Sequence, residues 1–245
     1  MRHEEIQRIY KNHYYTAFRD MGGVRKLVGK VDVLIFFVTD PKSQWTERAK
    51  QKYKQTQKKA MEILLKSARS RGIDLHLRNA YVQATVGMEC TRENFREWSK
   101  RIISQYATDI PTYQRRHEST MNCTEVPILF VFNKPFRSYA CQVDWLTRSY
   151  GELSAISSDY DVHTIIHELL HQFGAQDLYY PKQIKDLVTR LRYSSVMHSH
   201  ASVTVDSLSA YLIGWTDEID LSAVRILEKA KNYTREFMAK EIDRA

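Results

Sequence analysis

The stretch that most restricts the local fold is HELLHQFGAQD at positions 167–177. In an α-helix, residues i and i+4 lie on one face, so the imidazoles of His167 and His171 can both reach one cation. Gly174 stands where that helix has to end, because glycine enters the left-handed conformation without a Cβ penalty. The chain can then reverse and bring Asp177 back as a third ligand. The pattern therefore predicts a helix, a turn and a metal site within one short segment.

The ligand set predicts a zinc site with one coordination position left for water, which is typical of catalytic rather than structural zinc. Glu168 lies beside the first histidine, where its carboxylate can take a proton from a metal-bound water. His-Glu-x-x-His alone occurs by chance in roughly one chain in a hundred of this length. We therefore expect Zn²⁺ on His167, His171 and Asp177, with Glu168 as general base. The alternatives are another divalent ion, or a buried amphipathic helix with histidines on its polar side.

A second motif, YSSVMH at 193–198, lies downstream of the first. It resembles the Met-turn of the metzincin metallopeptidases, in which a methionine, here Met197, lies beneath the metal-binding histidines. The two motifs together resemble metzincins with an aspartate as third ligand, such as the snapalysins. The first motif also resembles that of the immune-inhibitor-A peptidases. Most metzincins carry a third histidine in place of Asp177.

Many metzincins also carry a tyrosine soon after the Met-turn, whereas this chain has His198 and His200 there. The side chain that would support a developing oxyanion therefore has several candidates. Possible oxyanion or substrate contacts are Tyr179, Tyr180, Tyr193 and His198. Packing is the alternative role for each tyrosine. His163 lies one helical turn before His167, and it either contacts the substrate or the surroundings of the metal, or lies at the rim of the site.

Composition indicates one well-packed domain, since 245 residues are enough for a single core and few for two. The three cysteines do not form the paired spacing of a secreted disulfide framework. The start of the chain lacks an apolar signal core, and the longest apolar run, Val33–Val38, is too short to cross a bilayer. We therefore expect a cytoplasmic protein without a membrane span, with non-classical export left open. The net charge of +8 allows a nucleic-acid, membrane or acidic protein partner, or a basic surface without one.

Hydrophobic periodicity predicts the order of the secondary structure. Nearly continuous apolar runs indicate strands covered on both faces, and the histidine-bearing helix can be capped by Asp159 or Asp161. The expected strands are Val31–Thr39, pieces within Ile73–Val86, Val126–Phe132, a more exposed Arg137–Asp144, and Glu152–Ser157. The expected helices are 3–19, Trp45–Arg71, Thr91–Tyr106 with Thr91 as its cap, Val205–Leu212 and Leu221–Ile242, with a basic connection over Lys182–Arg192.

This order suits an α/β (α+β) fold, in which a mixed twisted sheet with one antiparallel edge strand backs the active-site helix. We expect one domain over 1–245, with an N-terminal helical extension (1–30), an upper subdomain with the sheet and zinc helix (31–174) and a small, mostly helical lower subdomain (175–245). The metzincin resemblance implies that Arg137–Asp144, with the loop to Gly151, pairs with an extended substrate by β-augmentation. An edge strand that is only blunted by its charges is the alternative.

The resemblance and the ligand pattern together imply a zinc-dependent endopeptidase that acts on a protein or peptide. The basic face of the helix 45–71 suggests, as an alternative, a metallopeptidase that acts on nucleic-acid-associated proteins, although such a face is more often solvated surface. A non-catalytic, metal-containing binding module is a third hypothesis, and Glu168 argues against it because a structural site needs no base. Hydrolysis of a non-peptide amide by the same zinc-bound water also remains open.

Overall fold

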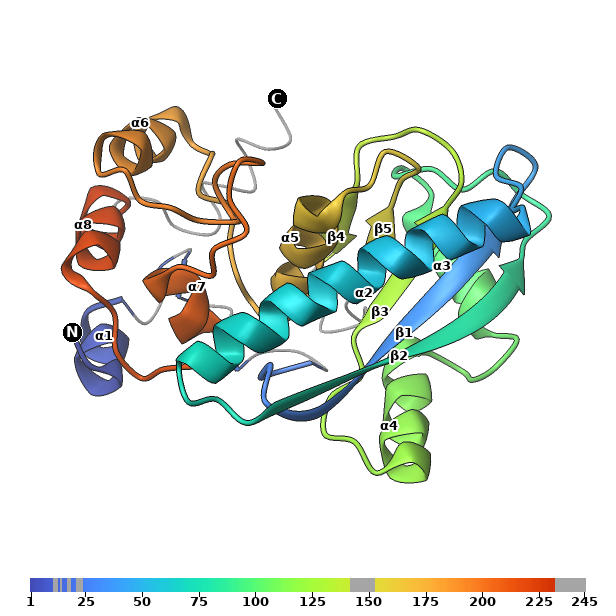
Figure 1. Cartoon of the computed structure of the whole chain (residues 1–245), viewed down its shortest axis with the longest axis horizontal. Helices are drawn as coiled ribbons and strands as arrows, with labels where there is room; N and C mark the ends of the chain where they lie inside the picture. The colour runs from blue at the N-terminus through green and yellow to red at the C-terminus, as the bar shows by residue number, and fades with distance from the viewer. Residues whose placement is uncertain (11–12, 14, 17–18, 21–23, 142–152, 232–245) are drawn as a thin grey trace.

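A computed structural model gives the fold of the chain (Figure 1) and describes residues 1–245 except 11–12, 14, 17–18, 21–23, 142–152 and 232–245. In chain order its elements are α1 (His3–Tyr10), β1 (Gly29–Thr39), α2 (Glu47–Ser70), β2 (Leu75–Thr85), α3 (Phe95–Ile103), α4 (Ile110–Met121), β3 (Ile128–Phe132), β4 (Tyr139–Cys141), β5 (Leu153–Ile156), α5 (Val162–Gln172), α6 (Lys182–Arg190), α7 (Ser207–Leu212) and α8 (Leu221–Lys229).

The five strands form one mixed sheet in the order β2-β1-β3-β5-β4. Strand β1 pairs in parallel with both β2 and β3, and β3 pairs in parallel with β5. Strand β4 is the exception, because it pairs antiparallel with β5 and lies at the edge of the sheet. The predicted mixed α/β sheet with an antiparallel edge strand is therefore confirmed.

Side chains on the central strand β1 alternate between two hydrophobic clusters, one on each side of the sheet. Val33, Ile35 and Phe37 belong to the cluster that includes the apolar faces of α2 and α5. Leu34 and Phe36 belong to the second cluster, which includes residues of α3 and α4. Both faces of β1 are covered, which explains why the strand reads as a nearly unbroken apolar run.

Helix α2 crosses one face of the sheet beside α5 (Figure 1) and confirms the prediction of a long helix over 45–71. Its buried stripe includes Tyr53, Ala60 and Leu64, and Thr46 caps its first turn by accepting from the backbone N–H of Ala49. Its exposed basic residues are Arg48, Lys52, Lys58, Lys59, Lys66 and Arg69. The basic face therefore lies in solvent, and binding of nucleic acid to it stays a prediction.

Two predicted helices are shorter than their apolar pattern indicates. Helix α1 covers His3–Tyr10 of the helix predicted over 3–19, and residues 11–12, 14 and 17–18 of that prediction lie outside the described residues. Beyond α1, the His13 ring contacts the Ala230 carbonyl at 2.7 Å and the Tyr15 hydroxyl donates to the Tyr180 carbonyl, so tertiary contacts replace helical ones. The helix predicted over 91–106 begins at Phe95, and Asn94 instead of Thr91 stands at its N-cap position, without a capping hydrogen bond from its side chain.

The capping error has a local cause. The Asn94 side chain turns back and accepts from the Thr91 backbone N–H while donating to the Glu89 carbonyl, which holds residues 89–94 in a turn. Two further helices were not predicted. Helix α4 carries a recognisable signal, because the Asp109 carboxylate caps it and a proline stands in its first turn. Helix α6 lies in the segment expected to be only a basic connection.

Three further predicted elements reach the limits of the described residues. The predicted strand Glu152–Ser157 is found as β5 over Leu153–Ile156, and residue 152 lies outside the described part. Strand β4 occupies Tyr139–Cys141 within the predicted Arg137–Asp144, and residues 142–144 lie outside the described part. Helix α8 ends at Lys229, and the predicted continuation from residue 232 to 242 also lies outside it. No helix among the described residues is long and apolar enough to cross a membrane.

The helices α1, α6, α7 and α8 gather at one end of the molecule, away from the sheet (Figure 1). The N-terminal segment is tied to this group, because the Met1 ammonium donates to the Ile219 carbonyl and the Leu27 N–H donates to the Ile213 carbonyl. The Trp215 indole donates in turn to the Leu27 carbonyl at 2.7 Å. Segments from the two ends of the chain therefore build this part of the molecule together.

A fully buried glutamine joins helix α5 to the sheet. The Gln172 amide accepts from the Ile128 N–H at 2.9 Å, and it donates to the Ile128 carbonyl at 3.0 Å and to the Ser154 hydroxyl at 2.9 Å. The Ser154 hydroxyl donates to the Glu168 backbone carbonyl, one helical turn earlier. These bonds hold the helix at a fixed height and rotation on strands β3 and β5.

We predict that Gln172→Leu lowers the free energy of unfolding by about 2–4 kcal/mol, because the Ile128 N–H and C=O are left buried without partners. Urea denaturation followed by circular dichroism measures this change. Gln51→Leu, on the exposed face of α2, is the matched control and is expected to change stability by less than about 0.5 kcal/mol. Equal stability of the two variants would contradict the anchoring role of Gln172.

Candidate metal centre

The ends of helix α5 place the two motif histidines. Asp161 caps the helix by accepting from the Thr164 N–H at 2.7 Å, which identifies the start among the two predicted positions. The helix ends at Gln172, and Gly174 adopts a φ of +94°, the left-handed conformation expected of it. The Ala175 N–H then donates to the Leu170 carbonyl, which closes the turn and sends the chain back toward the helix.

This reversal brings the three predicted ligands together. The Nε2 atoms of His167 and His171 lie 3.1 Å apart, and the Asp177 Oδ1 lies 3.1 Å from the first and 3.2 Å from the second. Donor atoms at the corners of a tetrahedron with metal–ligand bonds of about 2.05 Å are separated by about 3.3 Å. The side chains therefore already have nearly the spacing that one tetrahedral cation requires.

Backbone carbonyls determine which nitrogen of each histidine faces this point. The Nδ1 atom of His167 lies 3.0 Å from the Val196 carbonyl, and that of His171 lies 2.8 Å from the Ala175 carbonyl. Because a carbonyl only accepts, both rings must donate from Nδ1. In its neutral form each ring then presents the Nε2 lone pair to Asp177, as metal-binding histidines do.

The convergence of these donors has an electrostatic consequence. The Asp177 Oδ1 is buried, and among the described residues it lies against the Nε2 atoms of His167 and His171. Burial alone would raise the pKa of Asp177, but the nearby His171 and His167 hold that pKa well below its ordinary value. Burial lowers the pKa of His171, but the negative charge of Asp177 outweighs the effect of burial and raises this pKa to about 9. The pocket thus favours positive charge at the point where the three side chains meet, and the donor set suits zinc.

Glu168 lies beside this point with an unsatisfied carboxylate. Glu168 is 6% exposed, and its Oε2 is buried without a hydrogen-bond partner among the described residues. Burial raises the pKa of Glu168, while the two neighbouring histidines partly counteract this change. A buried polar atom without a partner is rare in folded proteins and calls for a specific explanation. A donor bound in the cavity, such as a water, would supply the missing partner.

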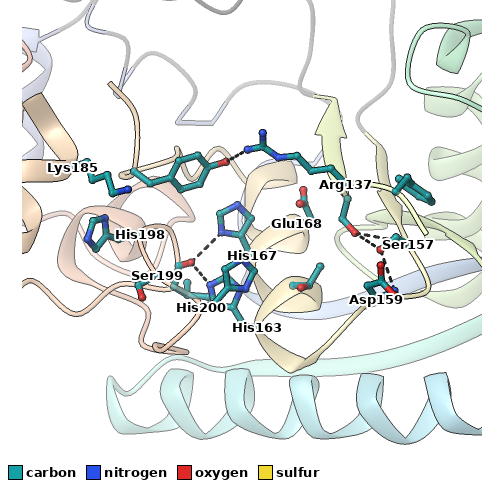
Figure 2. A pocket seen from close by; sticks show the side chains of 15 residues that line it. Arg137, Ser157, Asp159, His163, His167, Glu168, Lys185, His198, Ser199 and His200 are labelled. Carbon is teal, nitrogen blue, oxygen red and sulfur yellow. Dashed lines mark hydrogen bonds between the residues drawn. The ribbon is translucent and has the colours of Figure 1, made fainter. Parts of the chain in front are cut away.

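A cavity of about 500 Å³ opens beside the ligands and is shown in Figure 2. Glu168 and His167 lie on one side of it, and Arg137 reaches across from the segment before β4. The Arg137 guanidinium donates to the Tyr179 hydroxyl at 3.2 Å. Burial, and then the charge of Asp177, raises the pKa of Tyr179 above its ordinary value, so the phenol stays protonated.

The other sequence candidates have different positions. His198 lines the cavity, but its ring nitrogens contact the Leu178 carbonyl and the Thr189 hydroxyl. Tyr193 does not line the cavity, and its hydroxyl donates to Asp206 and accepts from the Leu208 N–H. Tyr180 is also outside the lining, and its carbonyl accepts from the Tyr15 hydroxyl. Tyr179 is therefore the tyrosine candidate that the structure brings to the site.

Met197 lies in a turn, fully buried in the same hydrophobic cluster as the apolar face of α5. The turn is held by three contacts: the Val196 N–H donates to the Thr204 carbonyl, the Met197 N–H to the Ser195 hydroxyl, and the Leu178 N–H to the Met197 carbonyl. The last of these contacts joins the turn to the residue after Asp177. The turn thus contacts both helix α5, which carries the two histidines, and the segment that carries Asp177.

The sequence interpretation gave some residues at the site a different role. Arg137 was predicted as the start of the edge strand that pairs with substrate, not as a side chain that reaches the metal ligands, and Ser157 and Asp159 at the far end of the cavity were predicted only as the end of a strand and a helix cap. The Val196 carbonyl was not considered, because a main-chain acceptor has no residue-type signal.

Comparison with known proteins adds no assignment. No protein-family model matches the chain, and no curated protein matches it in sequence. The residues of the site and their geometry are therefore the basis for its chemistry.

We predict that Asp177→Ala and His171→Ala each weaken binding of Zn²⁺ by more than about 100-fold. Loss of a hydrogen bond that only orients a ligand costs up to about 100-fold, and loss of the ligand itself should cost more. Competition with a fluorescent zinc chelator measures the affinity. Asp186→Ala is the matched control, because Asp186 is an exposed aspartate paired only with lysine at the surface. Wild-type affinity in the Asp177 variant would remove Asp177 from the ligand set.

Proposed function

We propose that the protein is a zinc-dependent endopeptidase of metzincin type. The observation that carries the proposal is the meeting of three lone-pair donors at nearly tetrahedral spacing, next to the partnerless Oε2 of Glu168. A structural zinc site is closed by four protein ligands, whereas the donors that meet here number three among the described residues, and one of them, His167, lines a cavity together with Glu168. This combination supports a hydrolytic site more than a structural one.

The residues of the chain divide the work of hydrolysis. His167, His171 and Asp177 would hold the zinc, which when bound would lower the pKa of a water and polarise the substrate carbonyl. Glu168 accepts the proton of that water on its buried carboxylate and later donates it to the leaving amine. Its raised pKa suits the first step, because a carboxylate that binds a proton more strongly is a better base toward the water.

Arg137 and Tyr179 are positioned to stabilise negative charge that develops on the substrate oxygen. The guanidinium is permanently charged, and the phenol remains a hydrogen-bond donor because its pKa is raised. Arg137 also orients the Tyr179 ring, which stacks at 6.1 Å on the His167 ring. Donors that are fixed before the reaction lower the barrier most when water is excluded from them.

The substrate would bind as an added strand. Strand β4 pairs with β5 along one side only, and its other side is the end of the described sheet. Arg137 lies just before β4, so a peptide paired with this edge would pass the cavity. Main-chain hydrogen bonds to an edge strand hold a peptide with little dependence on its side chains. The proposal therefore favours peptides over small amides.

We predict that Glu168→Gln abolishes peptide hydrolysis, with kcat lower by at least about 100-fold, while Zn²⁺ affinity changes by less than about 10-fold. Digestion of a peptide library, with and without chelator and read by mass spectrometry, tests the activity. Chelator-sensitive cleavage by wild type and none by the variant is the expected result. Cleavage by Glu168→Gln at the wild-type rate would remove Glu168 as the base. Zinc binding by wild type without cleavage of any peptide would favour a binding module or a non-peptide substrate.

We also predict that Tyr179→Phe and Arg137→Ala each lower kcat by about 100-fold with a smaller change in KM, because their contacts strengthen as charge develops on the substrate. Steady-state kinetics on a peptide found in the library digestion separates kcat from KM. Tyr81→Phe is the control, since Tyr81 is an exposed tyrosine that stacks on Phe37. A change in KM alone would assign both residues to substrate binding.

A further inference from the structure

A second cluster of metal-ligating side chains lies beside the first and shares no ligand with it. Asp161, His163 and His200 each offer one donor atom, and these atoms lie within 4.8 Å of one another. The rings of His163 and His200 are 4.2 Å apart between centroids. Figure 2 shows these two histidines together below His167. The three residues come from the start of helix α5 and from the turn after Met197.

His163 has an unexplained buried nitrogen. Its side chain is 6% exposed, and its Nε2 lies 2.9 Å from the Val196 carbonyl. The carbonyl only accepts, so Nε2 carries the hydrogen and Nδ1 presents a lone pair in the neutral ring. That Nδ1 is buried and has no hydrogen-bond partner in the part of the chain that the structure describes. An orphaned acceptor against another imidazole and beside a carboxylate is an expected feature of a cation site.

The other two members of the cluster can adjust to a cation. Asp161 uses one carboxylate oxygen to cap helix α5, and a carboxylate has further lone pairs to offer. Both Asp161 and His200 are exposed, so their side chains can rotate toward the buried and fixed His163. The donors lie at most 4.8 Å apart, so closing them to the roughly 3.3 Å of a tetrahedral site requires each separation to shrink by no more than about 1.5 Å, which lies within the reach of these side chains.

We propose that Asp161, His163 and His200 bind a second divalent cation, for which zinc is the best match because imidazole and carboxylate are its usual ligands. The two sites are joined through one backbone atom, since the Val196 carbonyl accepts from His163 and from His167. The second cation links the start of helix α5 to the turn that carries Met197. Its role is to hold that turn in place, and it takes no part in the proposed hydrolysis.

Zinc stoichiometry in ligand variants tests the proposal without any measurement of activity. Metal-free protein is dialysed against buffered micromolar Zn²⁺ and its zinc content is measured by atomic emission. We expect about two zinc ions per chain for wild type, about one for His200→Ala and for His171→Ala, and none for the double variant. His76→Ala is the control, because His76 is an exposed histidine beside an aspartate elsewhere on the surface.

A second measurement separates the cation site from a change in folding. Asp161→Asn keeps a residue that caps helices well but removes the charge. Without zinc, Asp161→Asn is expected to have the Tm of wild type. Zinc raises the Tm of His171→Ala through the second site alone, and adding Asp161→Asn to that variant is expected to reduce this rise. Retention of one zinc by the double variant His171→Ala/His200→Ala would overturn the proposal, as would a wild-type content of one zinc that His200→Ala leaves unchanged. Loss of zinc from His200→Ala with the first site intact supports it even if no peptide is cleaved.

Discussion

The structure depends on keeping three electron-rich atoms about 3.1 Å apart in a partly buried place. The Nε2 atoms of two histidines and one carboxylate oxygen repel one another unless a positive charge lies between them. Side chains on a mobile segment would move apart. Here, His167 and His171 are fixed by hydrogen bonds from their Nδ1 atoms, and the turn after Gly174 holds Asp177. The fold therefore holds the three ligands in the binding geometry before a cation is present, so the site is preorganised.

That rigidity comes from the parallel part of the sheet. Strands β1, β3 and β5 bury side chains on both faces, and helix α5 lies on one of these faces through its apolar residues and Gln172. The second hydrophobic cluster, under α3 and α4, supports the opposite face. The site is thus built on a regular element backed by two layers, while Arg137 and Tyr179 reach it from connecting segments. Fixed ligands and more adaptable surrounding groups are consistent with a site that has to admit a substrate.

The sequence was sufficient to predict the parts of the molecule in which a local pattern determines the structure. The apolar run of β1, the long helix α2, and the helix and glycine turn of the metal motif all follow from spacing. The end of α1 at Tyr10 was missed because His13 bonds to Ala230, a contact across most of the chain. Helix α4 was missed although its cap at Asp109 was visible, so that omission was one of interpretation. The positions of Arg137 and His200 could not be predicted, because they depend on how distant segments pack.

The bond pattern at Val196 has a consequence for how sites like this one can be recognised. One peptide oxygen orients two imidazoles on successive turns of a helix, and it does so whatever side chain residue 196 carries. Burial of Val196 in the hydrophobic core restricts this position to apolar side chains, but the orientation of both rings does not depend on which of them is present. The backbone carbonyl that sets the tautomers of both histidines therefore cannot be recognised from the amino-acid sequence. A search of backbone geometry, with one acceptor between two ring nitrogens, would detect it where comparison of residue identities does not.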